Sequence, residues 1–117
     1  MKKKIGMLWA TAVAMLMGLS AAHAQVKVPE EITTLMNKHA CSACHRVDAR
    51  LVGPAYTDVA TKKYTDEKIV ELIYKPVPAN WPGYPPMAAM TQVPKDDALK
   101  LAVYINSLAP KAAAKKK

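Results

Sequence analysis

Apolar residues recur at three- and four-residue intervals in the second half of the chain, and this spacing predicts amphipathic helices. The clearest run extends from Pro94 to Leu108. Its apolar stripe consists of Ala98, Leu101, Ala102, Ile105 and Leu108. Another helix is predicted over residues 66–75, because Thr65 can cap its start and Pro76 cannot continue it.

The first half of the chain predicts two more helices. One begins at Pro29 and runs through His39 and Ala40, so that it delivers Cys41. A short helix is predicted over about residues 54–63. No stretch shows the alternation of polar and apolar residues that marks a half-buried strand. The fold class predicted from the pattern is therefore all-α, with about four helices.

The apolar run at the start of the chain predicts export. Residues 5–19 carry no charge, follow three lysines and precede Ala22-His23-Ala24, which is the pattern of a secretory signal peptide. About 15 apolar residues are fewer than the roughly 20 that cross a bilayer as a helix, which argues against a retained membrane anchor. We expect residues 1–24 to be cleaved after Ala24, and residues 25–110 to form one soluble domain without a membrane span.

Positive charge is concentrated at the two ends of the chain. The 17 basic and 9 acidic residues give a net charge of +8, which falls to +5 without the three lysines of the signal peptide and to +1 without the four lysines of residues 111–117. A nucleic-acid-binding protein would instead spread lysine and arginine over a face of its fold, so we expect no nucleic-acid partner. Residues 111–117, rich in lysine and alanine, are expected to form a disordered tail.

Both cysteines of the chain lie in one pentapeptide, Cys41-Ser42-Ala43-Cys44-His45. A disulfide is compatible with export, but a redox Cys-x-x-Cys pair usually accompanies a strand-helix-strand pattern, and a closed zinc site would need a second pair of ligands downstream. These alternatives leave His45 unexplained. Covalent haem explains it, because the two thiols add to the vinyl groups of one haem and the next residue is held beside the iron. We therefore expect one haem c, attached through Cys41 and Cys44 and ligated by His45.

The residues after this motif read Leu51-Val52-Gly53-Pro54-Ala55-Tyr56-Thr57-Asp58-Val59-Ala60, and from about Pro29 to Leu108 the chain resembles the small bacterial monohaem class I cytochromes c. The resemblance implies the class I cytochrome c fold, with about four helices wrapped around one covalently attached haem, and a periplasmic location. It also implies that the carbonyl of Pro54 accepts a hydrogen bond from His45, which fixes the tautomer of the ligand and raises its basicity. An ordinary Gly-Pro turn before a helix is the alternative role for Pro54.

The second axial ligand is sought among the methionines, because His39 is expected on the same helix as His45 and could hardly reach the other face of a haem. Met87 and Met90 both lie in a proline-rich loop more than 40 residues after His45. In the family the ligand directly follows a proline, as Met87 follows Pro86, so the resemblance implies Met87. Met90 remains the alternative, and either thioether could instead fill space in the core.

Two further residues are implied as partners of the haem propionates. In relatives a tryptophan before the methionine helps to hold a propionate, which implies this role for Trp81. The segment from Lys75 to Trp81 departs from the spacing of the family, so core packing stays open for Trp81. Arg50 is the other candidate, with an ordinary exposed arginine as its alternative.

These expectations favour a periplasmic one-electron carrier. The chain shows no paired carboxylates, nucleophile triad or phosphate-binding glycine loop, so we do not expect an enzyme. Its partners are expected to be other redox proteins, and the protein itself to be a monomer or weak dimer. Two alternatives stay open: a haem c subunit bound tightly to a periplasmic dehydrogenase or reductase, and an open-site ligand-binding or peroxidatic haem protein, which the Pro86-Met87 pair disfavours.

Overall fold

The computed structural model describes residues 25–110, so the expected signal peptide and lysine-rich tail lie outside the described residues. In chain order the elements are α1 (Glu30–Lys38), the 3-10 turn η1 (Cys41–Ala43), α2 (Tyr56–Thr61), α3 (Asp66–Tyr74), the 3-10 turn η2 (Pro78–Asn80) and α4 (Lys95–Ser107). No strand occurs in this part of the chain, which confirms the all-α class with four helices. None of the helices between residues 25 and 110 is long and apolar enough to cross a bilayer.

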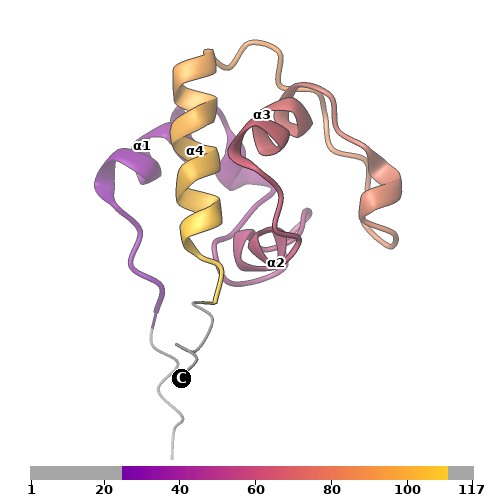
Figure 1. Ribbon diagram of the computed structural model, residues 1–117, viewed down its shortest axis with the longest axis horizontal. Coiled ribbons are helices and arrows are strands. Elements are labelled where there is room, and N and C mark those ends of the chain that lie inside the picture. The colour runs from indigo at the N-terminus through magenta and orange to yellow at the C-terminus, as the bar shows by residue number, and fades with distance from the viewer. Residues whose placement is uncertain (1–24, 111–117) are drawn as a thin grey trace, which may run out of the picture.

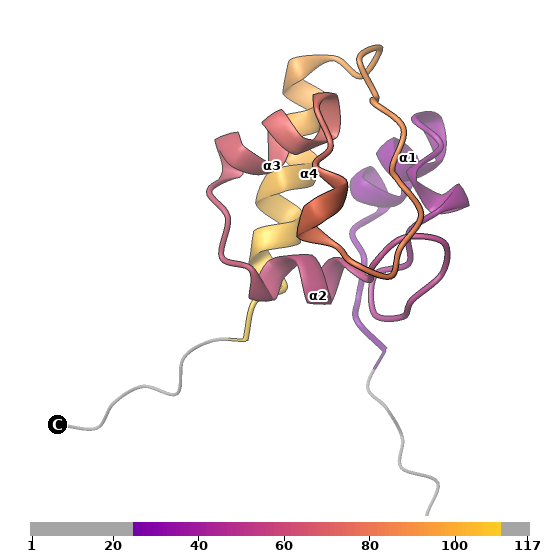
Figure 2. The ribbon, with the colours of Figure 1, turned by 90° about the vertical axis from the view of Figure 1, so that its right-hand side faces the viewer.

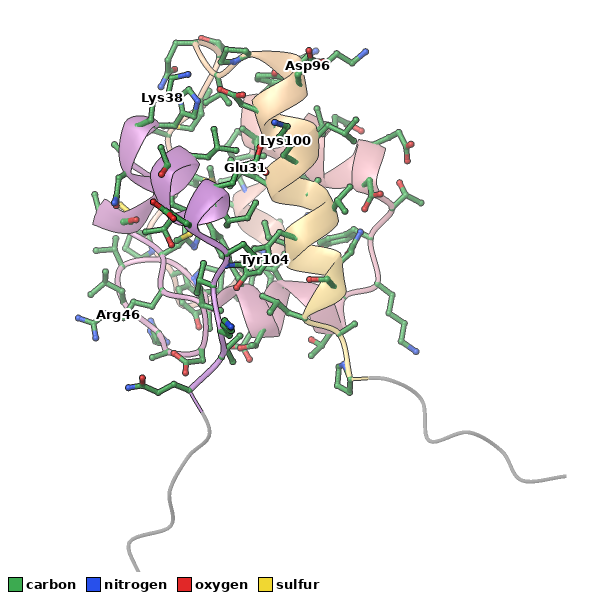
Figure 3. The ribbon with its side chains drawn as sticks, turned by 90° about the vertical axis from the view of Figure 1, so that its left-hand side faces the viewer. Glu31, Lys38, Arg46, Asp96, Lys100 and Tyr104 are labelled. Carbon is green, nitrogen blue, oxygen red and sulfur yellow. The ribbon has the colours of Figure 1, made fainter. Side chains whose placement is uncertain are left out.

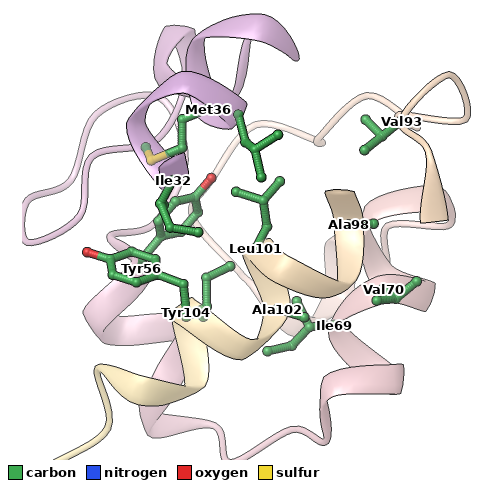
Figure 4. Packing of buried hydrophobic residues seen from close by; sticks show 12 residues of the cluster. Ile32, Met36, Tyr56, Ile69, Val70, Val93, Ala98, Leu101, Ala102 and Tyr104 are labelled. Carbon is green, nitrogen blue, oxygen red and sulfur yellow. The ribbon is translucent and has the colours of Figure 1, made fainter. Parts of the chain in front are cut away.

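The longest helix, α4, packs against each of the other three helices. α1 and α3 lie on either side of it, and α2 lies near its C-terminal end (Figure 1). The buried face of α4 consists of Ala98, Leu101, Ala102, Tyr104 and Ile105. These side chains pack with Ile32, Leu35 and Met36 of α1, Tyr56 of α2 and Ile69 and Val70 of α3 (Figure 4). The apolar stripe predicted for residues 94–108 is therefore the wall of the core against which the other helices pack.

Two of the predicted helix boundaries agree closely with the structure. α3 begins after Thr65, whose hydroxyl oxygen accepts a hydrogen bond from the backbone N–H of Lys68 at 3.1 Å. Such a cap satisfies one of the amide groups that the first turn of a helix leaves unpaired. α4 begins after Pro94, as predicted. α2 is shorter than expected, at residues 56–61.

The first helix differs from the prediction at its end. α1 stops at Lys38, because Ala40 adopts a left-handed backbone conformation with φ of 59°, through which a right-handed helix cannot continue. The chain then turns into η1, which presents Cys41. The expectation that His39 shares a helix with His45 is therefore wrong.

The segment between α3 and α4 carries both candidate methionines. It forms η2 and then returns toward α4 past the segment that follows the Cys-x-x-Cys-His motif (Figure 2). Prolines fix φ at positions 76, 78, 82, 85 and 86. The backbone N–H of Met90 donates to the carbonyl of Ile73 at 2.9 Å, and the Tyr74 hydroxyl donates to the carbonyl of Val93 at 2.7 Å. These bonds attach the returning half of the segment to α3.

Candidate functional site

An apolar cavity of about 340 Å³ lies between the helices and the segment that carries the methionines. Aliphatic side chains make much of its wall, among them Val52, Val59, Ile69, Leu72, Ile73, Val93, Leu101 and Ile105. Six of the seven predicted site residues line the same cavity, namely Cys41, Cys44, His45, Pro54, Trp81 and Met87, together with the alternative Met90. The seventh, Arg50, is not among the lining residues. The fold thus gathers into one apolar space residues that lie far apart in the sequence.

The two cysteines are presented by one tight turn. The backbone N–H groups of Cys44 and His45 both donate to the carbonyl of Cys41, at 3.1 and 2.9 Å. Neither thiol is in a disulfide; Cys41 is partly buried and Cys44 is exposed. Burial raises the pKa of the Cys41 thiol, which therefore stays protonated at neutral pH. The turn offers two reduced thiols and an imidazole within five consecutive residues.

The imidazole of His45 is held on three sides. Its Nδ1–H donates to the carbonyl of Pro54 at 2.8 Å, which leaves the lone pair on Nε2. The ring stacks on that of Tyr56, with 5.1 Å between centroids and 21° between planes. Burial lowers the pKa of His45, and the Pro54 hydrogen bond only partly opposes this effect. The ring is therefore neutral at pH 7 with Nε2 free to bind a metal, which is the state that a ligand requires.

Gly53 lies on the third side of the His45 ring, and we call Pro54, Tyr56 and Gly53 together the cradle of His45. A Cβ at position 53 would lie 2.5 Å from Cε1 and 2.9 Å from Nδ1 of His45, closer than atoms of these kinds approach. The N–H of Gly53 also donates to the carbonyl of Cys44 at 2.7 Å, so the backbone there cannot readily withdraw. Only glycine fits beside the imidazole at this point.

We expect Gly53→Ala to displace the His45 ring and to lower the free energy of unfolding of the haem-loaded protein by about 1 to 3 kcal/mol, as overpacking in a core does. Denaturant unfolding measures this change, and NMR shifts of the His45 ring protons report the displacement. Gly83→Ala is the comparison, because a Cβ at position 83 meets nothing within 4 Å and only its φ of 87° is strained. Unchanged His45 shifts in Gly53→Ala would contradict the cradle.

Met87 and Met90 lie in different environments, although both line the cavity. Met90 is partly buried, packs against the hydrophobic core and is attached to Ile73 through its backbone. Its sulfur also accepts a contact from the Gln92 side-chain amide at 3.9 Å. Met87 is 40% exposed and follows two prolines without such attachments to the core. Met90 thus has the surroundings of a packing residue, whereas the Met87 thioether remains available to the cavity.

Trp81 and Arg50 are brought to the same part of the surface. Trp81 lines the cavity and is partly buried. Arg50 is exposed, and its guanidinium donates to the carbonyl of Gly83 at 2.8 Å while lying 3.9 Å from the centroid of the Tyr84 ring. The roles of Trp81 and Arg50 as propionate partners stay predictions. The contacts of Arg50 with Gly83 and Tyr84 were not predicted from the sequence.

His39 is buried at the junction of α1 and α4. Its Nε2 lies 2.8 Å from Oδ2 of Asp97, and Nζ of Lys38 lies 3.3 Å from the same oxygen. His39 is not among the residues that line the cavity. The hydrogen bond from His39, followed by that from Lys38, lowers the pKa of Asp97 below its ordinary value of 3.8. This histidine therefore links the end of α1 to α4 and lies outside the cavity.

A carboxyl whose pKa is lower in the folded state stabilises the fold above its unfolded pKa, and this contribution is lost as the pH falls through the folded value. We therefore expect the free energy of unfolding to decrease as the pH falls below 3.8, and Asp97→Asn to remove this part of the decrease. Denaturant unfolding between neutral and acidic pH measures the difference. Asp96→Asn is the matched control, since Asp96 is exposed on the adjacent position of α4 (Figure 3). Equal pH profiles for both variants would contradict the role of the His39–Asp97 pair.

The residues of the site fit a covalently attached haem. Two free thiols, a neutral imidazole with its outer nitrogen available and a thioether line one cavity, and the rest of the lining is largely apolar. These are the donor types that bind haem c, and an apolar lining suits a large flat macrocycle. The surroundings of His45 provide an independent sign of fit, because the Pro54 carbonyl holds Nδ1–H and leaves Nε2 free.

Comparison with known proteins identifies the family of the chain. The family model described as cytochrome c matches residues 29–109. Cytochrome c-551 of Allochromatium vinosum is 37% identical over 78 residues, which cover 63% of this chain and 82% of that protein. Cytochrome c-551 of Pseudomonas aeruginosa is 39% identical over 51 residues, covering 44% of this chain and 49% of that protein.

A solved structure shows the same fold. The crystal structure of wild-type Nitrosomonas europaea cytochrome c552 superposes with a TM-score of 0.60 and 32% sequence identity, and the match covers 65% of this chain and 98% of that one. The expected fold is thereby confirmed. The chain belongs to the cytochrome c family, and it is a small monohaem class I cytochrome c that binds haem c covalently.

Proposed function

We propose that this protein is an exported one-electron carrier of the periplasm, with His45 and Met87 as the axial ligands of a haem attached to Cys41 and Cys44. The observation that carries the proposal is that His45, with Nε2 free, and Met87 line the apolar cavity that both cysteines also line. Bound haem supplies a ferric/ferrous couple that exchanges one electron, and a thioether ligand favours the ferrous state. The chain's own residues set the conditions for that exchange.

The first condition is a stable pair of ligands. Pro54 and Gly53 hold the imidazole of His45 in one tautomer and one orientation. Pro85 and Pro86 restrict the backbone before Met87, because each fixes its own φ. Ligands that are held in this way keep similar positions in both oxidation states, which keeps the rearrangement during electron exchange small.

The second condition is exclusion of water from the metal centre. The aliphatic wall of the cavity provides surroundings of low polarity, in which the additional positive charge of the ferric state is costly. This effect favours the ferrous state, as the Met87 thioether does. We therefore expect a reduction potential above that of a haem with two imidazole ligands.

The third condition is contact with partners. Cys44 is exposed, and Arg46, two positions further along the chain, points away from the body of the domain (Figure 3). A thioether at Cys44 would place one edge of the haem near the surface, where a donor or acceptor can approach. Small wet interfaces are typical of such short-lived redox encounters.

A redox titration of the mature haem-loaded protein tests the proposal. We expect one reversible wave with a one-electron slope that does not change over repeated cycles. Turnover of peroxide, or tight binding of carbon monoxide by the reduced wild-type protein, would instead indicate an open-site haem protein. Gel filtration from the native host distinguishes a free carrier, which elutes as a small protein, from a subunit that stays in a large complex.

A further inference from the structure

Two cationic side chains from the haem-motif half of the chain contact two aromatic rings of the segment that carries Met87. The guanidinium carbon of Arg50 lies 3.9 Å from the centroid of the Tyr84 ring. Nζ of Lys62, the residue that follows α2, lies 4.7 Å from the centroid of the Trp81 ring. Both distances are within the roughly 6 Å over which a cation and an aromatic face attract each other. The two halves of the chain are thus joined at two points, and both rings, Trp81 and Tyr84, line the cavity.

The contact of Arg50 is reinforced by a hydrogen bond and by packing of the two rings. The Arg50 guanidinium donates to the carbonyl of Gly83 at 2.8 Å. Trp81 and Tyr84 pack edge to face, with 5.9 Å between ring centroids and 85° between planes. We call these four residues, Arg50, Lys62, Trp81 and Tyr84, the loop clasp. Movement of either ring would disturb both cationic contacts.

The two aromatic residues of the loop clasp lie shortly before Met87 in the chain. Only Pro85 and Pro86 separate Tyr84 from Met87, and both have a fixed φ, so the orientation of Tyr84 is passed along the backbone to the methionine. On the other side of Met87, the backbone of Met90 is bonded to Ile73. The segment that carries Met87 is therefore attached on one side of Met87 to α3 and on the other side to the haem-motif half of the chain. Figure 2 shows this segment running beside the one that follows the Cys-x-x-Cys-His motif.

We propose that Arg50 is a positioning residue that, through Gly83 and Tyr84, holds the Met87 segment closed against the cavity. This proposal rests on the proposed role of Met87 as an axial ligand. It assigns to Arg50 a task different from that of a propionate partner, because its hydrogen-bonding fork and its charge are both directed at the segment that bears the ligand. Lys62 has the same task with a single, longer contact.

The size of the expected effect follows from the nature of the contacts. All of them lie near the surface, where charged contacts are weakened by water. We therefore expect loss of the Arg50 side chain to favour the open segment by about tenfold, and loss of the Lys62 side chain by no more than about threefold.

Imidazole titration of the oxidised, haem-loaded mature protein measures this equilibrium, because free imidazole competes with Met87 for the iron. We expect Arg50→Ala to bind imidazole about tenfold more tightly than wild type, with a thermal midpoint nearly unchanged. Arg50→Lys should restore part of the difference, since it keeps the cation but loses the planar fork. Tyr84→Leu should resemble Arg50→Ala, whereas Tyr84→Phe keeps the ring and should stay within about twofold of wild type. Arg46 is an exposed arginine beside the same motif, so Arg46→Ala is the matched control, and its imidazole affinity should equal that of wild type.

An imidazole affinity in Arg50→Ala equal to that of wild type would overturn the loop clasp. If the reduction potential shifts while the imidazole affinity stays unchanged, the result would return Arg50 to the propionates. A wild-type protein that lacks the sulfur-to-iron absorption band would show that Met87 is no ligand, so the proposed function would fail together with the clasp. A wild-type protein with the band and an unaffected Arg50→Ala variant would remove the clasp alone.

Discussion

Replacing Cys41 and Cys44 together by alanine is expected to abolish covalent haem binding and to leave most of the protein unfolded. Without a haem, a cavity of about 340 Å³ remains in the core. At about 24 cal/mol per Å³, a void of this size costs on the order of 8 kcal/mol, as much as the whole stability of a typical small domain. Haem staining after denaturing electrophoresis measures attachment, and far-ultraviolet circular dichroism measures folding.

Ser42→Ala is the matched control for this double variant. Ser42 lies between the two cysteines and is exposed, so its variant should retain both haem and helical signal. Each single cysteine variant can still form one thioether and should retain some haem at reduced yield. A double variant that folds like wild type without haem would show that the haem is not part of the core.

Replacing Met87 by alanine is expected to lower the reduction potential by on the order of 0.1 to 0.2 V, a modest part of the ≈ 0.8 V that axial ligands span. The reason is that the soft sulfur ligand, which favours the ferrous state, is lost and water reaches the iron. Met87 is 40% exposed, so its removal should disturb the packing of the domain little. Protein-film voltammetry measures the potential, and binding of carbon monoxide by the reduced variant reports the open position.

Met90→Ala is the comparison for this variant. Met90 packs against the core, so its removal should cost about 2 kcal/mol of stability or somewhat more. The reduction potential should stay close to that of wild type. If the potential falls in Met90→Ala and not in Met87→Ala, the two methionines exchange roles.

The parts of the site that are local in sequence were predictable. Cys41, Cys44 and His45 form one motif that uses every cysteine in the chain, so the covalent chemistry could be inferred without a fold. The stripe of α4 follows from helical periodicity, because a helix that faces a core repeats its apolar residues every three to four positions. Likewise Thr65 is a capping residue whose hydrogen bond needs only its own helix.

Features that depend on distant contacts could not be predicted in the same way. Alanine is a strong helix former, so nothing local indicates that Ala40 takes φ of 59° and ends α1 early. The bond between His39 and Asp97 joins residues 58 positions apart, and the close approach of Gly53 to His45 depends on how the chain folds back. The Gly53-Pro54 pair is the only local signal for that cradle.

Arg50 shows the same limit for a candidate site residue. An exposed arginine in a loop has no periodicity, so the sequence could suggest a propionate partner only through resemblance. Its contacts with Gly83 and Tyr84 cross 33 and 34 positions of the chain. They arise because the proline-rich segment returns beside the haem-motif loop, which is a property of the whole fold.

The absorption spectrum of the oxidised mature protein, compared with the spectra of Met87→Ala and Met90→Ala, tests the central claim most directly. Ligation by a methionine sulfur gives a weak long-wavelength charge-transfer band from sulfur to iron. We predict this band in wild type and in Met90→Ala, and its loss in Met87→Ala. Survival of the band in Met87→Ala, or its absence from wild type, would contradict a carrier that uses His45 and Met87 as its ligands.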